Sequence, residues 1–434
     1  MESAPDPAWD ALVEATPGGD LVQTTAWAAT RQRIGYRAAH LRLSSAGGRL
    51  IGGCIIQFKS TLAGLRIGAV ARGPLLFLDE PDAAAQIVHH MVCAARRLRI
   101  GVLIVQPPEG STILLEAMTA AGFRIGGPNV VPEATIRLDL RRPEDEILRN
   151  MNSNRRRRIR ETLRGGLITS RTDDVETFHR LHVASATRQG FRPVSIEELR
   201  AQWEILAPLG VCRLFVTRDG DVPVAGEWMT SFGGMLVSRF RGYDAARIAA
   251  KAAPSAAMWA CILWAKREGL RCLDFHGFDR NTIEHLAAGR APPPEFSQSI
   301  AYFKRSFGGT GVLFPKTQFI FTSSLMHTAF AGVTHRLLAN ASVRSLARGM
   351  NGLVRFHGTT EATTDMWPHT IIRAVVELIR GTWLGLSNRL VRRAQRRSAR
   401  VPTTVSRTAA RQQVEMPKPT PGAWLAGIWQ ELLR

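Results

Sequence analysis

The segment CRLFVTRDGDVPVAGEWMTSFGGMLVSRFRG, residues 212–242, decides the fold of this chain. It contains three runs rich in β-branched and aromatic residues, at 212–217, 222–230 and 235–241, with glycines in the turns between them. A helical pattern follows from Ser255, directly after Pro254, and it ends before Gly269 and a further apolar run. Three strands followed by a helix and another strand predict an α/β fold with a mixed sheet.

The first half of the chain repeats this plan. Strand-like runs at 39–43, 50–59 and 69–78 precede a helical segment at 83–98 and an apolar strand at 102–105. Three features of the first half recur in the second half. Ile51-Gly52-Gly53 corresponds to Val224-Ala225-Gly226 at an offset of 173 residues, and Arg72-Gly73 corresponds to Arg241-Gly242 at an offset of 169. The step from a helix through Gly101 to a strand recurs around Gly269, at an offset of 168. We therefore expect an α/β (α+β) architecture of two tandem lobes, each a mixed sheet flanked by helices.

Composition divides the chain into an N-terminal lobe (1–145), a C-terminal lobe (146–350) and a basic tail (351–434). The tail holds 13 Lys or Arg against five Asp or Glu. Apolar residues recur every three or four positions in its first part, which predicts an amphipathic helix at 370–394. The remainder is rich in Thr, Pro, Gln and Arg and is expected to be partly disordered. Such a basic helix either contacts an anionic membrane or packs on the second lobe.

The charge balance favours anionic partners. Lys and Arg number 57 against 36 Asp and Glu, a net charge of +21. Such an excess suits nucleic acid, an anionic membrane face or phosphate-bearing substrates, although arginine-rich surfaces alone also produce it. The five cysteines form no C-x-x-C pair and have no histidine at ligand spacing, so no metal site is expected.

The N-terminus, MESAPDPAWDALVEATPGG, lacks the basic and apolar regions of a signal peptide. No uncharged apolar stretch reaches the roughly 18 residues that span a bilayer. We expect a cytoplasmic protein, peripheral at the inner membrane face if the tail contacts lipid. The sequence leaves the oligomeric state open.

Several motifs resemble the FemAB family. Their order along residues 8–350 carries the resemblance, and they comprise Gln23-Thr24-Thr25-Ala26-Trp27, Arg72-Gly73-Pro74, the basic run Arg155 to Arg160, Asp274-Phe275-His276-Gly277, and Tyr302-Phe303-Lys304-Arg305-Ser306-Phe307-Gly308-Gly309. The fourth is similar to a family Tyr-Asp-Phe-Gly-Gly, with His276 in place of the first Gly. The last is similar to Phe-Lys-x-x-Phe-Gly-Gly.

The resemblance implies two lobes of the GNAT acyltransferase type. FemAB proteins add amino acids to peptidoglycan precursors from aminoacyl-tRNA, so the expected activity is transfer of an acyl or aminoacyl group to an amine on a cell-wall or envelope precursor. An acyl-CoA-dependent N-acetyltransferase acting on a small amine or sugar is a second interpretation. A non-catalytic basic membrane-surface or nucleic-acid-binding protein is the third. No permanently bound cofactor is expected, and the donor is either aminoacyl-tRNA or acyl-CoA.

Three residues are candidates for catalysis. The resemblance implies that Lys304 lies in the substrate cleft, where it neutralises a phosphate or a developing negative charge; otherwise it is a surface residue. Asp274 follows an apolar strand and is placed to accept a proton from an ammonium group or to cap the next turn. His276 titrates near neutral pH and either assists this base or is a polar filler.

Arginines and a glycine pair are the candidates for substrate binding. Arg72 and Arg241 are expected at equivalent strand ends, where guanidinium groups suit phosphate or form ion pairs. Arg155 and Arg158 lie in a run that cannot all face a core, so part of it meets an anion or solvent. Phe307, Gly308 and Gly309 complete the last motif, and the glycines permit a close approach of the backbone to a ligand or simply form a turn. A coenzyme A signature is weak, because Ala250 replaces the central glycine of Arg247-Ile248-Ala249-Ala250-Lys251-Ala252.

Overall fold

The computed structural model describes residues 5–60, 66–77, 81–245, 252–291, 296 and 299–323. The expected tail, with its amphipathic helix at 370–394, lies outside the described residues. The described part belongs to one compact unit, Met1–Val376.

The helices alternate with strands along both halves of the chain. They are α1 (Pro7–Ala15), η1 (Leu21–Gln23), α2 (Thr25–Arg33), α3 (Pro81–Arg97), α4 (Thr112–Ala120), α5 (Glu144–Asn150), α6 (Ser153–Arg164), α7 (Val175–Gln189), α8 (Ile196–Leu206), α9 (Ala253–Arg267), α10 (Arg280–Ala287) and α11 (Ile300–Arg305). Side-chain caps fix several of the beginnings, for example Asn152 on α6 and Asp279 on α10. None of the described helices is both long and apolar enough to cross a membrane.

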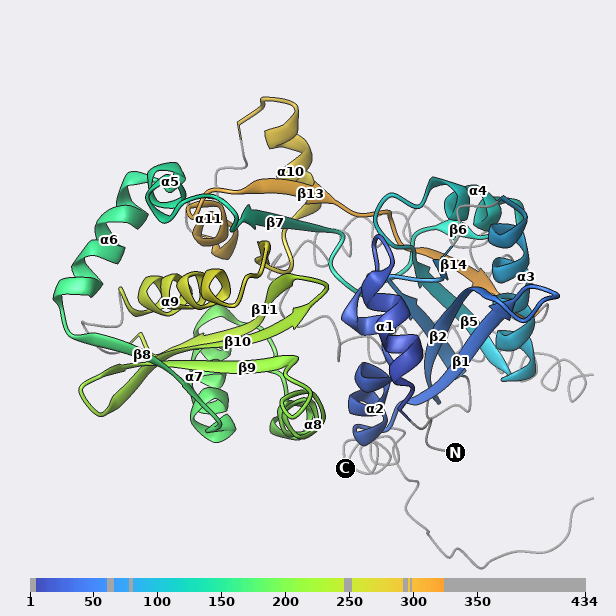
Figure 1. Cartoon of the computed structure of the whole chain (residues 1–434), viewed down its shortest axis with the longest axis horizontal. Helices are drawn as coiled ribbons and strands as arrows, with labels where there is room; N and C mark the ends of the chain where they lie inside the picture. Colours follow the sequence, from blue (N-terminus) through green and yellow to red (C-terminus); the bar gives the residue numbers. More distant parts are fainter. Residues whose placement is uncertain are drawn as a thin grey trace, which may run out of the picture. The chain divides into compact units, whose positions relative to one another are not determined.

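The strands form two mixed sheets (Figure 1). They are β1 (Arg37–Ser44), β2 (Leu50–Ser60), β3 (Arg66–Ala71), β4 (Leu75–Leu76), β5 (Ile100–Gln106), β6 (Arg124–Ile125), β7 (Ala134–Asp139), β8 (Leu167–Thr172), β9 (Cys212–Asp219), β10 (Val222–Phe232), β11 (Met235–Tyr243), β12 (Cys272–Asp274), β13 (Thr310–Leu313) and β14 (Gln318–Phe321). The first sheet has the order β1-β2-β3-β5-β14-β6, with β4 beside β2, and the second has the order β13-β7-β12-β11-β10-β9-β8.

The predicted duplication is visible in these orders. Strands β1-β2-β3-β5 and β9-β10-β11-β12 follow the same path, and each path ends in a parallel pair. Helix α3 precedes β5 as α9 precedes β12, and each packs on its own sheet. Strand β5 is buried at every position, with α3 packed on it and Val102 and Ile104 in a separate apolar cluster with Phe319 and Phe321, and this burial explains its continuous apolar sequence.

The two sheets exchange one strand each, so they do not divide at residue 145. Strand β7, expected in the N-terminal lobe, lies between β12 and β13 of the second sheet. Strand β14 returns to the first sheet between β5 and β6, as Figure 1 shows. The alternating residues Ala134, Ile136 and Leu138 of β7 are buried in the core of the second lobe.

The lobes also share a core. Leu21, Val22 and Trp27 of the first lobe are in one buried cluster with Phe178 and Trp228 of the second. Helices α2 and α8 pack together, and a buried ion pair of 2.6 Å joins Arg31 to Glu198 across them.

Candidate active site between the two lobes

A cavity of about 340 Å³ lies where the two lobes meet. Its walls come from the turn after α1, the end of β3, the start of β7, the adjoining ends of β10 and β11, and the turn after β12. The polar lining includes Asp20, Arg72, Arg137, Arg239, Arg271, Asp274 and His276. The structure therefore brings three predicted site residues, Arg72, Asp274 and His276, to one cavity.

His276 lies in a strained turn directly after β12. Its φ of +47° is in the left-handed region, where glycine is at no disadvantage. The family motif has glycine at this position, and here a histidine keeps the same backbone conformation. Burial, aided by the nearby charges of Arg239 and Lys304, lowers the pKa of the His276 imidazole well below its usual 6.5. The ring is therefore neutral at pH 7, and the same causes make it a weaker base than a free imidazole.

Asp274 holds that turn in place. Its Oδ1 accepts hydrogen bonds from the Thr135 hydroxyl and, at 2.7 Å, from the backbone N–H of His276. Its Oδ2 accepts a bond of 3.1 Å from Arg137 Nε. Both carboxylate oxygens are thus engaged by the protein, and this arrangement favours a positioning role for Asp274 over direct proton transfer.

Arg72 supplies a buried positive charge to the cavity. Its Nη2 donates to the carbonyl of Pro132 at 2.7 Å, and its guanidinium lies 3.5 Å from the ring centroid of Phe314. Burial lowers the pKa of Arg72 to about 10, and Asp20, whose carboxylate is 3.9 Å from Nε, opposes that shift. Arg72 therefore remains charged at neutral pH.

Arg239 is a cavity residue that the sequence interpretation missed. Trp228 of β10 pairs with Phe240 of β11, but the next residue, Met229, pairs with Ser238. Arg239 has no partner in this register and lies at a bulge. Its guanidinium lies over Trp27 and 3.7 Å from Asp20. No sequence signal marks this bulge.

Arg241 and Arg155 lie apart from this cavity. Arg241 is not the structural counterpart of Arg72. In the first sheet, Ala71 of β3 pairs with the last residue of β5, and Arg72 is the next residue. In the second sheet, Val237 of β11 pairs with the last residue of β12, and Arg241 lies four residues farther along the chain. The guanidinium groups of Arg241 and Arg155 lie 4.9 and 4.3 Å from the ring centroid of Phe303. Both arginines are buried.

The basic helix predicted at Arg155 to Arg160 is α6, but its first arginine points inward. Arg155 donates to Ser306 Oγ at 2.9 Å and to Ser255 Oγ. Burial lowers its pKa to about 10, and the charges of Arg158 and Arg241 add to the shift. Arg158 is half-buried and lines neither the cavity between the lobes nor the larger one described below.

Lys304 is placed behind the turn and lines neither cavity. It is 1% exposed, and its Nζ donates to the backbone carbonyls of His276 and Gly277 at 2.6 and 2.7 Å. The expectation that Lys304 faces one cavity with Asp274 and His276 is therefore wrong. A buried ammonium bound to two carbonyls of the His276 turn is suited to position that turn, and a catalytic role for it stays a prediction.

Phe307, Gly308 and Gly309 lie between α11 and β13 and do not line the cavity between the lobes. Phe307 is fully buried between Phe275 and Phe303, with ring centroids 5.4 and 5.2 Å away. The two glycines line a second, larger cavity. No group of His, Cys, Asp and Glu in the described ranges is arranged to hold a metal ion.

Comparisons with known proteins agree with this architecture. A family model described as the FemAB family matches residues 7–196, and one described as an acetyltransferase (GNAT) domain matches residues 149–282. The lipid II:glycine glycyltransferase of Staphylococcus aureus (strain MRSA252) is 23% identical over 222 residues, which are 48% of this chain and 52% of that protein. The same enzyme of strain NCTC 8325 / PS 47 gives equal values. The chain thus spans about half the length of the curated relatives it matches.

A solved structure shares the fold. The crystal structure of FemX has a TM-score of 0.61 at 16% identity, covering 72% of this chain and 95% of that one. The matching family models bear out the resemblance that the motifs predicted: the chain is similar to the FemAB family over residues 7–196 and to GNAT acetyltransferase domains over residues 149–282.

Proposed function

We propose that this chain transfers an acyl or aminoacyl group to an amine in the cavity between its lobes, and that the amine belongs to a cell-wall or envelope precursor. The Staphylococcus aureus relatives are lipid II:glycine glycyltransferases, which supports this reaction class and this acceptor. The match to the FemAB model supports it independently.

The observation that carries the proposal is a neutral imidazole beside two buried guanidinium groups. Acyl transfer to an amine needs a base and a site for negative charge. His276 accepts the proton as the new C–N bond forms and returns it to the oxygen or sulfur that leaves the acyl carbon. Arg72 and Arg239 are buried, line the same cavity, and are suited to stabilise the oxyanion or a phosphate.

The donor is aminoacyl-tRNA in this proposal, as the resemblance to the FemAB family implies, and the enzyme keeps no permanent cofactor. The match of residues 149–282 to a GNAT acetyltransferase domain favours acyl-CoA as the second candidate donor. The weak coenzyme A motif at 247–252 lies almost wholly outside the described residues. Peripheral location at the cytoplasmic membrane face, through the basic tail, is part of the same proposal.

The test is an in vitro assay with wild-type protein and His276→Asn. Asn tolerates positive φ better than most residues, so the variant keeps the turn and loses the imidazole. We expect turnover to fall roughly 10²- to 10⁴-fold, the usual contribution of a positioned base. Aminoacyl-tRNA and acyl-CoA are supplied in parallel, with a lipid-linked muropeptide as the acceptor.

Three outcomes decide the question. Product from acyl-CoA alone would favour the second donor. Unchanged turnover in His276→Asn would remove His276 from the mechanism. No transfer from either donor would favour the non-catalytic interpretation, a basic membrane-surface or nucleic-acid-binding protein.

A further inference from the structure

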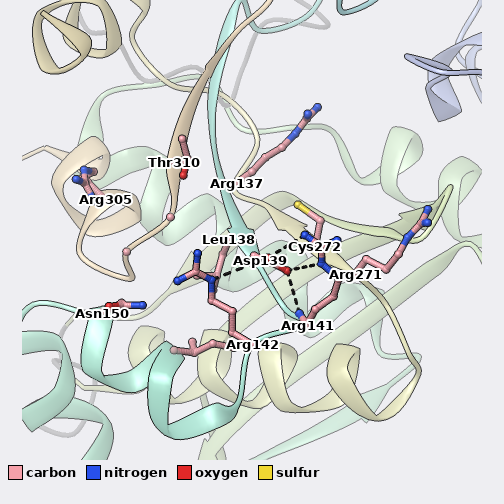
Figure 2. Close-up of a pocket in the computed structure, with 13 residues that line it drawn as sticks. Arg137, Leu138, Asp139, Arg141, Arg142, Asn150, Arg271, Cys272, Arg305 and Thr310 are labelled. Carbon is pink, nitrogen blue, oxygen red and sulfur yellow. Dashed lines mark hydrogen bonds and ion pairs between the residues drawn. The ribbon is translucent and has the colours of Figure 1, made fainter.

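A second cavity, of about 670 Å³, lies at the C-terminal end of β7 (Figure 2). The end of β7, helix α5 and the segment from α11 to the start of β13 line it. Five arginines contribute to the lining, namely Arg137, Arg141, Arg142, Arg271 and Arg305, against one carboxylate, Asp139. The lining therefore has an excess of positive charge, and of its arginines Arg137 is paired with Glu109 and Asp274 outside the lining.

The carboxylate neutralises only part of this charge. Asp139 binds Arg141 through two hydrogen bonds of 2.9 Å, and these bonds hold the pKa of Asp139 down at about 2. Arg142 forms its closest ion pair, 2.9 Å, with Glu146 on α5. Arg305 is exposed at the end of α11, and Figure 2 shows it across the cavity from Arg141.

Two glycines shape the wall opposite these arginines. Gly308 and Gly309 both have φ values near +87°, so they continue the chain in the left-handed region directly after the last motif. A Cβ atom on Gly309 would lie 2.5 Å from the carbonyl oxygen of Arg137. The glycines thus let α11 approach β7 closely and bring Arg305 to the cavity.

The two cavities have common walls. Arg137 and Arg271 line both of them. Arg137 binds Asp274 beside the His276 turn, and in Figure 2 its side chain points away from Arg141 and Arg142. A ligand anchored in the basic cavity is therefore close to the chemistry proposed for the other one.

We propose that the basic cavity binds a diphosphate group. Its volume suits a compact ligand, since small-molecule sites measure about 300–1,000 Å³. Arginines on several sides suit clustered phosphate oxygens. None of the described lining residues is aromatic, which disfavours single-stranded RNA, because its bases are normally stacked on aromatic rings.

The Cys272 thiol also lines this cavity, and it fits a binding role. Burial raises the pKa of this thiol to about 11, so it stays protonated at neutral pH and is a poor nucleophile. The inference that the bound diphosphate belongs to the substrate rests on the proposed acyl transfer. The binding site itself does not depend on that reaction.

The experiment is isothermal titration of the full-length protein with inorganic pyrophosphate. The test variant is Arg142→Gln combined with Arg305→Gln, two changes on exposed side chains. We expect binding to weaken roughly tenfold or more, because each change removes charge-assisted hydrogen bonds. Arg96→Gln, an exposed arginine on α3 in the other lobe, is the matched control and should bind as the wild type does.

The result is decisive either way. Wild-type protein that fails to bind pyrophosphate, or a double variant that binds it equally well, overturns the site. A short single-stranded RNA that loses affinity in the double variant, while pyrophosphate does not, assigns the cavity to nucleic acid instead. The titration requires no turnover. If the protein bound pyrophosphate but transferred no group from any donor, the proposed reaction would be refuted and the binding site would stand.

Discussion

His276 combines a strained backbone with a perturbed imidazole, and the two features are linked by its turn. A non-glycine residue at positive φ costs about 1–2 kcal/mol. The surrounding bonds maintain this conformation, with Asp274 accepting from the backbone N–H and Lys304 donating to the carbonyl. The motifs singled out these three residues, but a sequence cannot reveal that two of them hold the third.

The lowered pKa of His276 predicts how stability depends on pH. Unfolded chains bind a proton at this residue below about pH 6.5, whereas the folded protein does so only well below that value. The free energy of unfolding should therefore be insensitive to this group above pH 7 and fall as the pH decreases. Between pH 7 and 5.5 we expect a loss of about 1 kcal/mol from this residue.

Urea unfolding of wild-type protein and His276→Asn at both pH values measures this contribution. The variant should lose less stability on acidification, since its side chain does not titrate. Equal losses in the two proteins would mean that the folded imidazole protonates normally.

Strand β11 shows how one element can direct neighbouring arginines to different places. Simple alternation puts Arg239 and Arg241 on the same side of the strand. The bulge opposite Trp228 breaks that alternation, so Arg239 reaches the cavity near Asp20 while Arg241 packs on Phe303. The sequence predicted the strand itself but not the bulge, because no residue in it requires one.

This difference between the two arginines can be tested as a pair. Arg239→Gln should lower kcat/KM at least tenfold, because it removes a cavity charge, an effect worth about 1.5–3 kcal/mol. Arg241→Gln should change kcat/KM less than about threefold and act mainly on the unfolding midpoint, as expected for lost packing and hydrogen bonding. Steady-state kinetics below both midpoints separates the two effects. A larger kinetic effect from Arg241 would place the substrate at Phe303 instead.

The whole molecule is more entangled than its sequence indicates. Periodicity located most of the strands of both lobes, and the offsets of about 170 residues indicated the duplication. Periodicity missed β6, β8, β13 and β14, and it predicted one strand at 69–78 where β3 and β4 are separate. The exchange of β7 and β14 could not be read in the same way, because an apolar strand pairs equally well with either sheet. The sequence prediction assigned β7 to the first lobe only because of its position in the chain. In the structure, β7 pairs with β12 of the second sheet.

This entanglement predicts that the lobes unfold together. The exchanged strands, the shared core around Trp27 and Phe178, and the buried pair Arg31–Glu198 all connect them. Glu198→Ala leaves Arg31 buried without its carboxylate, and breaking a buried pair on one side costs about 3–5 kcal/mol. We expect one calorimetric transition in both proteins, at a lower temperature in the variant.

A matched apolar pair separates the charge from the packing. Replacing both residues, Arg31→Met with Glu198→Leu, should recover most of the lost stability, because no buried charge remains unpaired. Glu176→Ala, which removes an exposed partner of Arg200 on the neighbouring helix, should cost less than about 1 kcal/mol. Two separate transitions in Glu198→Ala would show that the exchanged strands do not couple the lobes, and that the ion pair alone had held them together.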